Sequence, residues 1–134
     1  MKQSSFRFLG LFDLILVTAL AGVFGPQVLV APAVILFVVG GLAASLTGLL
    51  SALTVGPVHL TWRQLAALSY FAFALLWPAL YLPDVIAGTA VGFELLLFVV
   101  MSGAALIFAF IGVDILRGGD HFSIEPNVER VIAI

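Results

Sequence analysis

Ionisable side chains are rare in this chain, and two acidic ones interrupt its long apolar runs. Asp13 lies within residues 8–24, and Glu94 stands near the start of residues 91–116. A carboxylate at membrane depth is costly, so it faces protein or water more often than lipid. Each acid therefore suits the binding of a proton or a cation, or serves as a structural hydrogen-bond acceptor.

Asp13 has several hydrogen-bond donors near its own depth. At 1.5 Å per helical residue, Asp13 lies about 8 Å in from Phe8, and Tyr70 lies about 10 Å in from Arg63. An unpaired carboxylate at that depth must gain a proton or find donors. We predict a buried polar cluster in which Asp13 accepts at least one hydrogen bond, formed by Asp13, Thr47, Ser51, Arg63 and Tyr70.

Glu94 has two aromatic residues at its own depth. Trp77 and Tyr81 stand near the end of the preceding run, and both carry a polar group that seeks a partner when buried. We predict an outer polar site in which Glu94 bonds Tyr81 or Trp77, directly or through one water. Asp114 and Arg117 stand three residues apart on the last run, and we expect them to pair with each other.

Other kinds of site lack the residues that they need. The chain has no cysteine, which excludes disulfides and thiolate metal sites. His59 and His121 have no obvious third ligand, so we expect no metal and no cofactor. No nucleophile has a base at a suitable spacing, so we do not expect an enzyme. Its five Lys and Arg residues are scattered, so we expect no nucleic-acid partner.

The composition excludes an ordinary soluble protein. Hydrophobic residues make up 63% of the chain, charged residues only 9%, and the mean hydropathy is +1.30. A soluble fold of this composition would expose large apolar patches and aggregate. We therefore expect the lipid bilayer to be its main partner.

Four apolar runs predict the fold. They cover about residues 8–24, 28–54, 61–82 and 91–116, and short breaks separate them. The fold class is therefore all-α, an integral membrane four-helix bundle running up-down-up-down. We divide the chain into a bundle at 1–117 and a cytoplasmic tail at 118–134. The tail has three possible places: on the membrane surface, beneath the bundle, or free of it.

Local signals mark several helix ends. Thr61 and Gln64 have the spacing of a capping box, which predicts a helix start. Gly88 and Gly92 are the expected break between an interfacial turn and the fourth helix. Pro78 bends the end of the third helix.

The second run carries small residues on one helical face and leucines on the other. Helices in membranes associate where small residues let their backbones approach. We predict that Gly40, Ala44 and Gly48 pack against neighbouring helices and that the leucines face lipid. This helix should then contact more of the bundle than any other helix.

Positive charge predicts the orientation. With four spans, all five basic residues fall on one side, which the positive-inside rule places in the cytoplasm. Both termini are then cytoplasmic in a multi-pass protein of the cell membrane. The motif Ala19-Leu20-Ala21 also resembles a signal-peptide cleavage site, so cleavage of residues 1–21 stays open.

Two functions are compatible with these features. We expect a structural or accessory subunit, which packs as a homo-oligomer or within a larger membrane complex. The alternative is a small oligomeric transporter or ion channel that uses Asp13 and Glu94.

Overall fold

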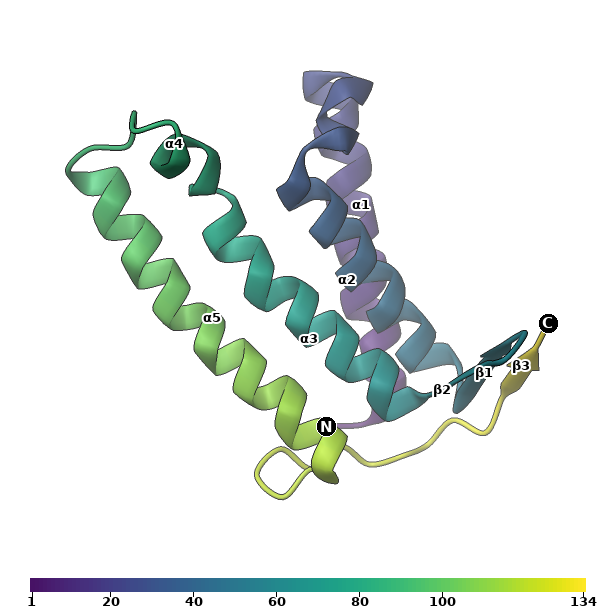
Figure 1. The fold of residues 1–134 in the computed structure, drawn as a ribbon. Helices are drawn as coiled ribbons and strands as arrows, with labels where there is room; N and C mark the ends of the chain where they lie inside the picture. Colours follow the sequence, from purple (N-terminus) through teal and green to yellow (C-terminus); the bar gives the residue numbers. More distant parts are fainter.

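The structure is a computed structural model that describes residues 1–134, and it is mostly helical with one small sheet (Figure 1). Its four long helices are α1 (Phe6–Phe24), α2 (Pro32–Leu49), α3 (Trp62–Ala79) and α5 (Phe93–Arg117). The short helices are η1 (Gln3–Ser5), η2 (Pro26–Val30) and α4 (Leu82–Ile86), and the strands are β1 (Ala52–Val55), β2 (Val58–Thr61) and β3 (Val131–Ala133). The predicted all-α class is therefore wrong in one respect, because three strands form a sheet.

The long helices form an open row and not a closed bundle. Helix α2 packs between α1 and α3, and α3 packs between α2 and α5, whereas α1 and α5 make no extensive contact. The pairs α1/α2 and α3/α5 converge at the end that carries the sheet and diverge toward the other end (Figure 1). Helix α3 is as central as α2, so the prediction that α2 has the most extensive contacts is wrong.

Small residues bring α1 and α2 together. A side chain added at Gly48 would overlap the backbone of Arg7, and one added at Gly10 would overlap the backbone of Gly41. On the side toward α3, Gly40 lies under the ring of Phe73. Ala44 is fully buried, whereas Leu42 and Leu49 are exposed. The small face of α2 therefore points into the protein and its leucines point outward.

The second helix is shorter than the predicted range 28–54 at both ends. It begins at Pro32, because proline lacks an N–H and fits the first helical turn better than the interior. It ends at Leu49, after which β1 and β2 form an antiparallel hairpin around Gly56 and Pro57. Gly56 has φ +57°, as a two-residue hairpin turn requires.

The third and fourth runs follow their local signals. Thr61 and Gln64 form the capping box at the start of α3, and Pro78 lies in the last turn of that helix. Helix α4 is the short turn before the break, and α5 begins at Phe93. Gly88 (φ +72°) and Gly92 (φ +56°) lie between them in a conformation that side chains disfavour. The expected break and capping box are confirmed.

The last residues are part of the fold and not a separate tail. Strand β3 pairs in parallel with β1, which gives the strand order β2-β1-β3. The N-terminus joins the same end of the molecule, since the Gln3 N–H donates to the carbonyl of Glu125. Of the three places considered for residues 118–134, only the one free of the bundle is therefore wrong.

The core lies where the helices converge. It contains Phe6, Ala44, Ala66 and Ile115, from all four long helices. Gln3 is also fully buried, and its side-chain amide donates to the carbonyls of Thr47 and Leu50 at 2.9 Å each. These bonds satisfy carbonyls at the C-terminal end of α2, which have no partner within the helix.

Three helices are long and apolar enough to cross a membrane. They cover residues Gln3–Phe24, Pro32–Leu49 and Phe93–Arg117. Helix α3 is outside this group because it is less apolar. The described fold therefore has three such segments and not the four that we predicted.

Candidate functional site

A groove lies above the point where the helices converge. Its volume is about 250 Å³, and all four long helices contribute to its walls. Helix α1 provides Leu9 and Asp13, and the other helices provide one leucine and five aromatic rings. These rings are Phe37, Tyr70, Phe73, Trp77 and Phe108. One acidic residue thus lies in an otherwise largely apolar and aromatic site.

Asp13 is buried in this groove without a partner. Its exposed fraction is 5%, and neither carboxylate oxygen forms a hydrogen bond or an ion pair within the chain. Its position follows from the close approach of α1 to α2, since the Asp13 Cβ packs on Gly41. A buried carboxylate normally has donors around it. Asp13 is therefore an exception that needs an explanation.

The predicted polar cluster around Asp13 is not formed. Thr47 donates to the carbonyl of Ala43 in its own helix, and Ser51 donates to the carbonyl of Arg130. Arg63 donates to the carbonyl of Ile115 at 3.3 Å. Asp13 packs at the level of Gly41, whereas Gly48 packs on Arg7, so Thr47 lies nearer the converging end than Asp13 and Ser51 lies beyond the end of α2. Their hydroxyls bond backbone carbonyls there instead. Of the predicted donors, only Tyr70 lines the groove with Asp13.

The predicted outer polar site does not form a direct hydrogen bond either. Glu94 is exposed in the first turn of α5 and bonds neither Trp77 nor Tyr81. The diverging helices place Glu94 away from the groove. Trp77 instead lines the groove, and its buried Nε1 has no acceptor. Trp77 therefore belongs with Asp13 and Tyr70.

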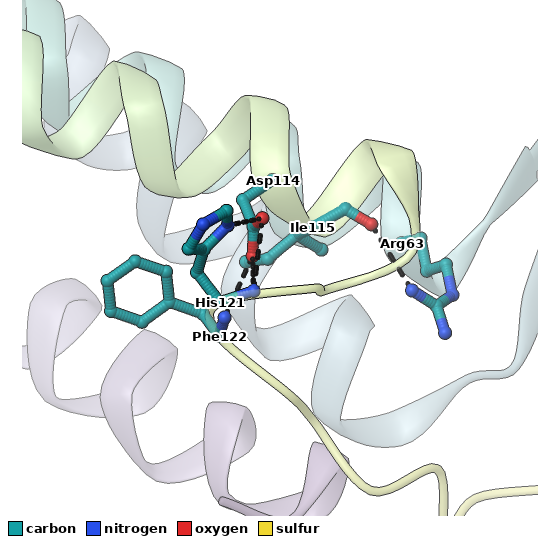
Figure 2. Close-up of polar contacts among 5 residues, drawn as sticks. All are labelled: Arg63, Asp114, Ile115, His121 and Phe122. Atoms are coloured by element: carbon teal, nitrogen blue, oxygen red, sulfur yellow. Dashed lines mark hydrogen bonds and ion pairs between the residues drawn. The ribbon is translucent and has the colours of Figure 1, made fainter.

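A second polar site was missed by the sequence analysis. The Asp114 carboxylate accepts the N–H groups of His121, at 3.1 Å, and of Phe122, at 2.8 Å (Figure 2). The His121 ring nitrogen Nδ1 lies 2.9 Å from the same carboxylate. The predicted pair between Asp114 and Arg117 is therefore wrong. Gly118-Gly119 marks the end of α5 in the sequence, but it does not show that the chain folds back onto that end.

Helix ends explain this second site and its neighbour Arg63. Gly118 and Gly119 have φ +124° and +78°, so the chain reverses directly after α5. Arg63 at the start of α3 reaches the carbonyl end of α5 (Figure 2). A guanidinium is favourable there because the helix dipole is negative at its C-terminus. Both contacts stabilise the C-terminal end of α5.

A second cavity separates this polar site from the groove. Its volume is about 300 Å³, and its walls include Met1, Tyr70 and His121. Tyr70 lines both cavities and therefore lies between Asp13 and the converging end of the helices. Its ring packs edge-on against Phe6 at 6.2 Å.

Comparison with known proteins identifies a family and no function. Residues 1–128 match the model of a family of unknown function, DUF7994. No curated protein and no solved structure matches the chain.

Proposed function

This chain belongs to DUF7994, and from its geometry we propose that it is a multi-pass protein of the cell membrane that acts as a structural or accessory subunit. It packs with a second copy of itself or within a larger membrane complex. The observation that supports this most is the open helix row. Helices α1 and α5 stand at its two ends, and each packs along only one long neighbour. In a closed monomeric bundle, each helix would pack along two neighbouring helices, so no helix would have a side free for a partner.

Chain direction supports a fourth span. Helices α2 and α5 run the same way in Figure 1, so the chain must return between them, and α3 is the segment that does so. Its lower apolarity is tolerable because α2 and α5 cover two of its sides. All five basic residues lie toward the converging end, which favours a cytoplasmic position for this end and for both termini.

Copurification tests the accessory function. The tagged chain is extracted into polymer-bounded native nanodiscs, and its mass and companions are determined. We expect either a defined homo-oligomer or a defined set of membrane partners. A lone monomer in native nanodiscs would contradict the proposal.

Cysteine crosslinking locates the contact. The chain has no cysteine, so single substitutions report cleanly. Leu106 of α5 is 73% exposed, so Leu106→Cys should crosslink to a copy or a partner in membranes. Ser69→Cys is the matched control, because Ser69 is fully buried within the chain. No crosslink at Leu106→Cys would contradict a contact through this face of α5.

Transport is a second candidate, favoured by the unpaired Asp13 carboxylate. Glu94 does not reach the groove, so this alternative now rests on Asp13 alone. In liposomes, ion or solute flux should disappear in Asp13→Asn and persist in Glu94→Gln. Equal flux in the two variants would remove Asp13 from this function.

A further inference from the structure

The negative charge of Asp13 has no counter-ion within the chain. The Arg7 guanidinium lies over the ring of Phe8, 4.7 Å from its centre, and Arg63 bonds the carbonyl of Ile115. The only ion pair in the fold joins Asp114 and His121. A buried carboxylate must then bind a proton or a cation from outside.

The groove walls favour an organic cation. Five of its eight lining residues are aromatic, and the face of an aromatic ring attracts a cation within about 6 Å of its centre. The rings also contact one another, since Trp77 and Phe108 lie 6.4 Å apart between centres and Tyr70 and Phe108 lie 6.2 Å apart. Carboxylate and aromatic faces together can surround a cation that keeps no water.

Metal ions and primary ammonium ions fit the groove less well than a quaternary ammonium does. Hard metal ions take several oxygen ligands, and the fold brings together no group of three possible metal-ligating residues. A primary ammonium concentrates its charge on three N–H donors, and donors directed at the aromatic part of the wall would find no oxygen acceptor, because the side chains of the groove offer only the Asp13 carboxylate and the Tyr70 hydroxyl. A quaternary ammonium has no N–H and needs no acceptor.

We infer that the groove between the four long helices binds a quaternary ammonium group, with Asp13 as its counter-ion and the aromatic rings as its walls. The volume of about 250 Å³ suits a small head group. It lies just below the range of about 300–1,000 Å³ that is typical of pockets for drug-sized ligands. The same chemistry is present in free choline and in the head group of phosphatidylcholine. The inference goes beyond the accessory function and holds whether or not the chain has a partner.

Choline and its uncharged isostere dimethylbutanol, in which carbon replaces nitrogen, test the site. The full chain is purified in dodecyl maltoside, a detergent without a cationic head group, and binding is measured by titration calorimetry. Trp77 fluorescence in a Trp62→Phe background reports the groove directly, because the chain has only these two tryptophans. We expect choline to bind and dimethylbutanol not to bind measurably.

Two variants and a matched control test whether the Asp13 charge and the aromatic rings contribute to choline binding. Asp13→Asn keeps the shape of the side chain and should weaken choline binding at least about tenfold. Glu94→Gln removes one carboxylate outside the groove and should bind as the parent does. Phe108→Leu keeps an apolar wall without a ring and should weaken binding roughly two- to thirtyfold. Circular dichroism and thermal melting confirm that each variant is folded.

The lipid composition of the bilayer distinguishes a lipid head group from a free cation. If the head group of a lipid fills the groove, phosphatidylcholine nanodiscs should suppress choline binding, whereas phosphatidylglycerol nanodiscs should not. Equal binding in both would support a free cation. The inference is overturned if choline does not bind the parent chain, if dimethylbutanol binds equally well, or if folded Asp13→Asn binds choline as the parent does.

Discussion

Single glycines decide how closely the helices of this protein approach. Gly48 faces the backbone of Arg7, whereas Gly103 on α5 has no neighbour within 4 Å of an added Cβ. The same substitution should therefore have opposite effects at the two positions. Backbone cannot move aside as the tip of a flexible side chain can, so α1 must shift to admit a methyl group at Gly48.

We predict that Gly48→Ala lowers the free energy of unfolding by about 1–3 kcal/mol through overpacking. Gly103→Ala should raise it by up to about 1 kcal/mol, because alanine is the better helix former. Unfolding in mixed micelles with increasing dodecyl sulfate measures both. A Gly48→Ala protein as stable as Gly103→Ala would show that α1 and α2 are not in close contact.

The Asp13 carboxylate is the second residue whose environment sets stability. Because it lacks donors in the chain, it contributes desolvation cost without compensating bonds. In a protein without ligand, we predict that Asp13→Asn raises the free energy of unfolding by about 1–2 kcal/mol, since an amide is cheaper to bury than a charge. The same unfolding assay at neutral pH measures this, with Glu94→Gln as the control. A loss of stability in Asp13→Asn would reveal a partner for the carboxylate.

At the level of elements, the turn from Gly118 to Phe122 depends on one acid. Asp114 accepts two backbone N–H groups and the His121 ring, whereas Asp120 in the same turn is exposed and forms no hydrogen bond. We predict that Asp114→Ala speeds hydrogen exchange at the His121 and Phe122 amides and lowers the free energy of unfolding, because both N–H groups lose their acceptor. Asp120→Ala should change neither. Equal exchange in the two variants would contradict the role of Asp114.

Element types followed from the sequence wherever a local signal determined them. Thr61 with Gln64 predicted the start of α3, and Gly88 with Gly92 predicted the break before α5. The sheet was not predicted, because Leu53-Thr54-Val55 continued an apolar run that was assigned to a helix. The alternation in that segment and in Val58-His59-Leu60, on either side of Gly56-Pro57, is a hairpin signal that the prediction did not take into account.

The candidate site was predictable only in part. An acid within an apolar run drew attention to Asp13, and the aromatic residues of the third run included Tyr70 and Trp77. Their common location could not be predicted from depth alone, because equal depth does not fix rotation or the order of helices. Thr47 and Ser51 lie nearer the converging end than Asp13, which packs on Gly41, and their hydroxyls bond backbone carbonyls. The Asp114–His121 contact depends on a chain reversal that composition does not reveal.

At the scale of the whole molecule, the two helix pairs meet at one end, and the groove lies above their junction. Residues from both ends of the chain hold this junction together. The Gln3 side-chain amide donates to a carbonyl at the end of α2, and the Ser51 N–H donates to the carbonyl of Arg130 at 2.7 Å. Because the other end has no comparable contacts, the separation of the two pairs sets the width of the groove.

The orientation of the whole molecule can be tested with single cysteines in this cysteine-free chain. Ser4, Val58 and Ser123 lie at the converging end, and Ala87 lies at the other end between α4 and α5. We predict that a membrane-impermeant maleimide labels Ala87→Cys in intact cells, and that it labels the other three variants only after permeabilisation. If α3 did not cross the membrane while α2 and α5 did, α5 would have to run the opposite way. Ser123→Cys would then be labelled in intact cells, and this outcome would contradict the four-span arrangement.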